Sequence, residues 1–327
     1  MAYTHRPALR AGLVASLSLV LLVPAAPASA QASWTVVASP SPSTVASALQ
    51  DVVIVPSTNV AWAVGYRYDS AAAAYRTLTM RNTGSGWSVV SSPNQGTGYN
   101  QLKKVDATAT NNVWALGSDG SGNLVERYDG TAWRVVGSPP VGVRDLDVLS
   151  ANEVWAVGSS GSTTAVARWL NGSWQVVPSL PGAANHLMVF EAVSARAPDD
   201  VWAVGWDRDY SVSSRPVSSL VAHYDGSTWT RIPSPNPRTR NTLYGVLALS
   251  ATDVWAVGVA QNVGGGIEDD SLMMRWDGTS WTTVTTPEAE PGSGDKVLAV
   301  TAVSASSIWG IGYYSSPTSG LVEPLLL

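Results

Sequence analysis

The hexapeptide DVWAVG at residues 253–258 decides the fold, because close variants of it occur six times along the chain. The tryptophans at their centres are Trp62, Trp114, Trp155, Trp202, Trp255 and Trp309. A second series, mostly of the form aromatic-Asp-Gly-x-x-Trp, ends on Trp34, Trp87, Trp133, Trp174, Trp229 and Trp281. Twelve of the 15 tryptophans therefore recur at intervals of 41 to 55 residues, which indicates a repeat protein.

Each repeat divides into four short segments, named A to D in chain order. In the repeat from Leu243 to Pro287 they are LYGVLALS, DVWAVGVA, SLMMRWDG and SWTTVTTP. Apolar and β-branched residues dominate them and turn residues join them, which favours strands. An apolar residue stands nine positions before every first-series tryptophan, so the same A–B hairpin is expected six times. The sequence predicts an all-β, six-bladed β-propeller with four antiparallel strands per blade.

The two ends of the chain predict how the ring closes. SWTVVASP at residues 33–40 has the pattern of a D strand, whereas GLVEPLLL at residues 320–327 has the pattern of a C strand. We therefore expect the N-terminal strand to complete the last blade, which removes an open sheet edge. Pro324 is unexpected in a strand, since proline lacks a backbone N–H.

The first 30 residues have the pattern of a secretory signal peptide. Arg6 and Arg10 precede an apolar run that ends at Val23, and Ala28-Ser29-Ala30 is a cleavage-type sequence. We expect residues 1–30 to be removed and residues 31–327 to form a single propeller domain that is secreted into the extracellular space. A retained membrane anchor is the alternative.

Composition narrows the function classes. Without Arg6 and Arg10 the chain keeps 17 basic against 24 acidic residues, so nucleic acid is a poor partner. The chain has no cysteine, so its core must hold the fold without disulfides. No hydrophobic stretch after the signal peptide is long enough to span a membrane.

The loops between B and C and between D and A vary in length and content, whereas the A–B and C–D turns are short and repetitive. Because strands alternate in direction, the two variable sets lie on one face, which is the expected working surface. Aromatic and charged residues open three of the longer B–C loops. These candidate ligand-binding residues are Tyr66, Arg67, Tyr68, Asp69, Trp206, Asp207, Arg208, Asp209, Tyr210, Tyr313 and Tyr314.

A second candidate site is the mouth of the central channel, where strand A begins. The residues expected there are Asp51, Lys103, Lys104, Arg144, Asp145, Glu191 and Tyr244, with Tyr99 and His186 nearby. They suit an anionic sugar, or they pair with one another around a water-filled channel.

Aromatic rings flanked by carboxylates and guanidinium groups suit a glycan, because sugar C–H faces stack on rings and polar groups bind the hydroxyls. A protein ligand uses the same residue types, and exposed loop residues without a partner remain a third interpretation.

Few catalytic or metal sites fit this sequence. Only His186 and His223 remain beyond the signal peptide, and no zinc or nucleotide motif is present, so no cofactor is expected. Calcium is the one metal left open, at Glu268, Asp269 and Asp270 or at Asp207 with Asp209. Glycoside hydrolysis needs two placed carboxyl groups, for which Asp51, Asp145 and Glu191 are the candidates.

DVWAVG followed by aromatic-Asp-Gly-Thr-Ser-Trp resembles the repeats of secreted actinobacterial β-propeller proteins. The repeat period lies between those of WD40 and kelch-like propellers, and the Asp-Gly-x-x-Trp turn is similar to the Asp-box, or BNR, turn of sialidase-like propellers. The turn at Asp277 is one residue shorter than the usual Asp-box, and the sialidase FRIP signature is missing, so no catalytic residues carry over. The resemblance implies lectin-like recognition or a recognition subunit of a larger secreted assembly.

The function predicted from the sequence is a secreted, non-catalytic module that binds a glycan or cell-surface polymer through the B–C and D–A loop face. Two alternatives stay open: a protein-binding subunit of a secreted complex, such as an antibacterial toxin particle, and an extracellular polysaccharide hydrolase or lyase.

Overall fold

The computed structural model describes residues 37–262, 269–304 and 306–327, and all of their regular structure is β-strand. The predicted signal peptide, Glu268 and the first half of the expected N-terminal strand, residues 33–36, lie outside these ranges. The expected all-β class is confirmed. In the described ranges no helix is long and apolar enough to cross a membrane.

The first three repeats each form a separate four-stranded antiparallel sheet, in the strand order A-B-C-D that the sequence predicts. Their strands are β1 (Ser47–Ile54), β2 (Ala61–Asp69), β3 (Ala74–Asn82), β4 (Trp87–Val90), β5 (Gln101–Ala109), β6 (Asn112–Ser118), β7 (Asn123–Tyr128), β8 (Trp133–Val135), β9 (Val143–Ser150), β10 (Glu153–Ser160), β11 (Thr163–Leu170) and β12 (Ser173–Val177).

The fourth and fifth repeats have the same order, and one parallel pairing of Val217 with Arg240 joins them into a single sheet. Their strands are β13 (His186–Ala197), β14 (Asp200–Asp209), β15 (Val217–Tyr224), β16 (Trp229–Arg231), β17 (Arg240–Ser250), β18 (Asp253–Gln261), β19 (Asp270–Trp276) and β20 (Trp281–Val284). The last sheet has three described strands, β21 (Gly294–Ser304), β22 (Ser307–Ser315) and β23 (Val322–Leu326). Pro324 lies in β23, the outermost strand of its sheet within the described residues.

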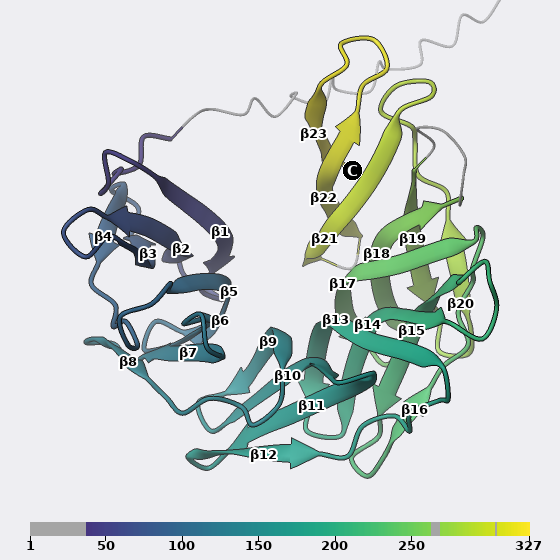
Figure 1. The fold of residues 1–327 in the computed structure, drawn as a ribbon, viewed down its shortest axis with the longest axis horizontal. Helices are drawn as coiled ribbons and strands as arrows, with labels where there is room; N and C mark the ends of the chain where they lie inside the picture. The colour runs from purple at the N-terminus through teal and green to yellow at the C-terminus, as the bar shows by residue number, and fades with distance from the viewer. Residues whose placement is uncertain (1–36, 263–268, 305) are drawn as a thin grey trace, which may run out of the picture. The chain divides into compact units, whose positions relative to one another are not determined.

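Consecutive sheets are neighbours in space. Each A strand contacts the A strand of the next repeat, in the series β1, β5, β9, β13, β17, β21 (Figure 1). The site described below lies at the start of these A strands.

The glycine of every VWAVG-type segment is required by a β-bulge in the neighbouring A strand. In each repeat this glycine pairs with the residue just before the bulge, as Gly205 does with Phe190. The bulge brings a carbonyl, that of Val189, directly over the glycine, so a Cβ on Gly205 has no room. The same close approach occurs at Gly65, Gly117, Gly158, Gly258 and Gly312. An extra unpaired residue in strand A therefore explains why the B-strand glycine recurs six times.

The two tryptophan series pack consecutive repeats together. Trp62 is fully buried and meets Trp133 of the next sheet edge to face, with ring centroids 5.2 Å apart. Equivalent pairs are Trp114 with Trp174, Trp155 with Trp229, and Trp202 with Trp281. In the second, third and fifth repeats the motif's first residue accepts a hydrogen bond from the indole N–H, as Asp253 does from Trp255 at 3.0 Å. A basic side chain covers the ring, as Arg168 covers Trp155 at 4.9 Å.

Side chains of one A strand also bind backbone N–H groups of the next. Asp51 accepts a hydrogen bond from the amide of Val105 at 2.9 Å, and Asp145 accepts one from the amide of Val193 at 3.0 Å. Asp106, Asp147 and Ser194 make equivalent bonds to Val148, Ala195 and Ala248. The inner strands lack a ladder partner on this side, so these side chains satisfy amides that are otherwise unpaired.

Gly205→Ala tests the bulge contact. We expect it to lower the free energy of unfolding by about 3 kcal/mol, because the added methyl group must displace backbone rather than a side-chain end. Gly137→Ala is the matched control, since a Cβ there meets open space. Urea denaturation of both variants measures the difference, and equal stabilities would contradict the assigned role of the bulge.

Glu126 generates a second prediction, because it is a carboxylic acid in the apolar core. It is fully buried on β7, opposite Ala115, and within the described residues neither of its side-chain oxygens has a hydrogen-bond partner. Burial raises the pKa of Glu126 to about 8. The corresponding positions of the other sheets, each opposite the motif alanine, are Met80, Ala167, Ala222 and Met274.

Glu126→Met places in this repeat the residue that two other repeats carry, and we expect it to stabilise the fold most at high pH. The folded-state pKa lies above the unfolded value, so wild-type stability falls as pH rises from about 4.5 to about 8. The gain from the variant should grow by about 3 kcal/mol between pH 5 and pH 8, since one unit of pKa shift corresponds to about 1.4 kcal/mol. Denaturation curves at the two pH values measure this, and parallel pH profiles would refute it.

Candidate functional site

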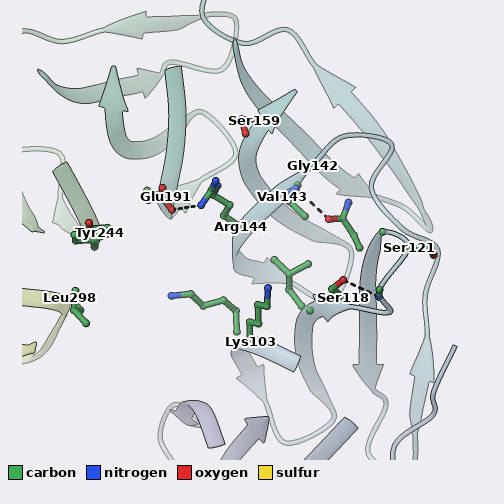
Figure 2. A pocket seen from close by; sticks show the side chains of 16 residues that line it. Lys103, Ser118, Ser121, Gly142, Val143, Arg144, Ser159, Glu191, Tyr244 and Leu298 are labelled. Atoms are coloured by element: carbon green, nitrogen blue, oxygen red, sulfur yellow. Dashed lines mark hydrogen bonds and ion pairs between the residues drawn. The ribbon is translucent and has the colours of Figure 1, made fainter. Parts of the chain in front are cut away.

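A cavity of about 820 Å³ lies at the start of the A strands (Figure 2). Its wall includes Lys103, Lys104, Arg144, Glu191 and Tyr244, five of the seven residues that the sequence places at the channel mouth. The other two, Asp51 and Asp145, bind backbone amides of the next strand and are not part of the wall.

The A-strand bulges supply most of the charged and apolar side chains of this wall. Each bulge leaves one residue without a partner in the register, and in order along the chain these are Gln50, Lys103, Arg144, Glu191, Tyr244 and Leu298. The last five all line the cavity. The bulge that requires glycine in strand B therefore also places one side chain in the cavity wall in each of five repeats.

The wall carries more positive than negative charge. Its charged residues are Lys103, Lys104, Arg144 and Glu191. Lys104 lies 3.7 Å from Asp145, which raises the pKa of the Lys104 ammonium and keeps it charged. Arg144 contacts Glu191 at 3.2 Å, yet the Arg144 side chain is 49% exposed. Lys103 is exposed and forms no ion pair with the described residues.

Glu191 links the cavity to the variable loops. One of its oxygens accepts a hydrogen bond from the Trp206 indole at 2.8 Å, and the other accepts one from Arg144. On the other side, burial and the nearby Glu191 and Tyr313 raise the pKa of Tyr244, although Lys296 opposes them. Trp206 and Tyr313, predicted as loop residues, thus lie close to the mouth residues, so the two candidate sites meet.

A cluster of four tyrosines lies beside the cavity. Tyr75 is its centre, with ring centroids 5.3 Å from Tyr66, 5.3 Å from Tyr68 and 4.9 Å from Tyr99. Tyr99 is 39% exposed and packs near Gly120, a residue of the cavity wall. Arg67 and Asp69, the charged residues predicted with Tyr66 and Tyr68, form an ion pair at 3.7 Å.

The other predicted aromatic rings are covered by cations or bound through their hydroxyl groups. Arg208 lies over Trp206 at 5.4 Å, Arg215 over Tyr210 at 5.6 Å, and Lys296 over Tyr313 at 5.5 Å. The Tyr314 hydroxyl donates a hydrogen bond to Glu323 at 3.0 Å. These rings therefore offer fewer open faces than the sequence suggests.

Among the carboxylates considered for calcium, the four that the structure describes already bind other groups of the protein. Asp207 is buried and contacts His186 and Arg231, each at 2.7 Å, while Asp209 accepts the amide of Ser211. Asp269 pairs with Lys296 and Asp270 with Arg238. Among the described residues no group of three or more His, Cys, Asp or Glu side chains is placed to hold a metal ion.

The three carboxylates considered for glycoside hydrolysis are engaged through both oxygens. Asp51 accepts the amides of Val52 and Val105. Asp145 accepts the amide of Val193 and pairs with Lys104, and Glu191 binds Trp206 and Arg144.

Sequence reasoning missed Leu298 and Tyr75. Leu298 stands fourteen residues before the motif glycine Gly312, the same offset that separates Lys103 from Gly117, so the repeat alignment contained the signal. Tyr75 pairs directly with Tyr68 across the B–C hairpin and was detectable from that register.

Neither a protein-family model nor a curated protein matches the chain. Among solved structures, YCF48 bound to a D1 peptide is 13% identical, with a TM-score of 0.50 and coverage of 80% of this chain and 87% of that one. The structure of U3-55K is 9% identical, with a TM-score of 0.53 and coverage of 85% and 80%. YCF48 from Cyanidioschyzon merolae is 14% identical, with a TM-score of 0.49 and coverage of 85% and 94%.

These similar structures are β-propellers, and at such identities the likeness identifies the fold alone. The chain therefore has a β-propeller fold. Its resemblance to actinobacterial repeats and to the Asp-box turn stays a prediction.

Proposed function

We propose that this protein is an exported, non-catalytic recognition propeller whose variable-loop face and channel mouth bind an extended polypeptide. One observation carries the proposal. The bulge that recurs in every A strand presents a chemically different side chain in each repeat, and five of the six line one cavity. A residue that only supported the fold would be expected to recur, as the motif glycine does.

The engaged carboxylates favour binding over catalysis. Asp51, Asp145 and Glu191 have both oxygens occupied by amides, an indole or basic side chains. A general acid or nucleophile must reach its substrate, and freeing any of these groups removes a bond on which neighbouring strands depend.

The ring contacts favour a polypeptide over the glycan or cell-surface polymer that the sequence suggested. Stacking of a sugar needs an open ring face, whereas cations cover Trp206, Tyr210 and Tyr313. Tyrosine edges, hydroxyl groups and arginines suit protein recognition. YCF48, a similar fold, has been solved with a D1 peptide bound, so a propeller can serve this purpose.

We propose further that the propeller is a closed ring of six blades, with the segment from Ser33 supplying the fourth strand of the last blade. In the first four repeats each first-series tryptophan contacts the second-series tryptophan of the following repeat, and this pattern supports the proposal. Trp309 is 40% exposed and Trp255 only partly buried, whereas their counterparts Trp62, Trp114, Trp155 and Trp202 are covered by a tryptophan of the next sheet. We therefore expect Trp87 to cover Trp309 and Trp34 to cover Trp255.

Selection from a peptide library displayed on phage, in parallel with a glycan array, tests the proposed function. We expect peptides to be enriched and the array to stay blank. Tyr99→Ala should weaken binding of the enriched peptides about tenfold, because it removes the exposed ring of the tyrosine cluster beside the cavity.

Val176→Ala is the control, since it removes an exposed apolar side chain from the outer strand β12. Glycans bound without peptides would refute the polypeptide proposal and support a lectin. Product formed from any bound polysaccharide would refute the non-catalytic assignment.

A further inference from the structure

The bulge residues divide the cavity mouth into two arcs of different chemistry. Lys103 and Arg144, on the adjacent strands β5 and β9, form a cationic arc. Tyr244 and Leu298, on β17 and β21, form an arc with apolar surface. Figure 2 shows the two arcs facing each other across the open centre of the cavity.

The cationic arc is available to a ligand. Lys103 is exposed and has no ion-pair partner in the described ranges. Arg144 uses one terminal nitrogen for Glu191, which leaves further N–H donors on a half-exposed guanidinium group. Lys104 adds a third positive charge that Asp145 holds in place. This excess of positive charge occurs in a chain whose net charge is −5.

The opposite arc is suited to an apolar group. Leu298 is 40% exposed, although it is an aliphatic side chain and lines the cavity. Tyr244 is partly buried beside it and adds the surface of its ring to this arc. An apolar side chain placed here by a ligand removes the leucine surface from water.

We propose that the mouth binds an acidic polypeptide segment, with Lys103 and Arg144 holding a carboxylate and Tyr244 and Leu298 holding an apolar side chain next to it. This inference rests on the proposed function, because it specifies the polypeptide that the same face binds. The cation–carboxylate contacts form in an open, water-filled cavity, so affinity falls as ionic strength rises.

Three labelled probes test the inference by fluorescence anisotropy with the purified protein. They are a short peptide of alternating glutamate and leucine, its counterpart with glutamine for glutamate, and an oligogalacturonate as an anionic glycan. We expect the glutamate peptide to bind most tightly. Lys103→Gln should weaken that complex about tenfold and leave the glutamine peptide unchanged, because only the first ligand offers a carboxylate.

Lys103→Gln copies Gln50, the residue at the same bulge of β1, so the scaffold already accepts glutamine there. Arg134→Gln is the matched control: it changes the net charge equally, but Arg134 lies on the outer strand β8 and pairs with Asp129. Leu298→Gln should weaken both peptides alike.

Equal affinity of wild type and Lys103→Gln for the glutamate peptide would overturn the carboxylate assignment. If both peptides then still bind and lose affinity with Tyr99→Ala, the proposed polypeptide function stands. If only the oligogalacturonate binds, both proposals fall and an acidic-glycan lectin replaces them.

Discussion

The close approach of an A-strand carbonyl to the glycine of the neighbouring B strand is the contact on which the rest of the molecule depends. A bulge inserts one extra residue into strand A, and the strand bends so far toward its partner that only glycine fits opposite it. In the same step the inserted residue loses its partner in the ladder. The bulge thus requires glycine at one position of strand B in every repeat, and it leaves the bulge residue of strand A able to differ between repeats.

The sheets around this contact are joined by directional bonds as well as by apolar packing. Tryptophan pairs exclude water between neighbouring sheets, while Asp51, Asp106 and Asp145 satisfy the inner-strand amides that a ladder would otherwise occupy. Acidic residues near the channel are therefore largely part of the scaffold. Among the bulge residues at the mouth, Lys103 carries a charge without an ion-pair partner in the described ranges, whereas Arg144 pairs with Glu191.

The sequence predicted features set by local periodicity and failed where distant strands meet. Strand order and the two tryptophan series followed from residues a fixed distance apart, so Trp62 was correctly assigned to a B strand. The bond between Trp206 and Glu191 joins β14 to the bulge of β13, and Arg208 lies over the same ring, so this ring is less open to stacking than the sequence suggested. Asp51 and Asp145 were expected to line the channel, but their side chains bind backbone amides of the next strand instead. Strand alternation does not give the direction of a side chain that follows a bulge, so the sequence could not show this. Leu298 was overlooked because an apolar residue in a strand is ordinarily assigned to the core.

A bulge side chain that projects into an open cavity contributes little to core packing, so its chemistry is free to differ between repeats at small cost in stability. Exposed Lys103 and Arg144 occupy the position that Leu298 and Tyr244 occupy in later repeats, and the same backbone carries all four. Residues that hold the sheets together have no such freedom, as the recurring glycines and tryptophans demonstrate. Separation of stability from specificity within a single repeat is what a recognition surface requires, since its ligand preference then changes without loss of the fold.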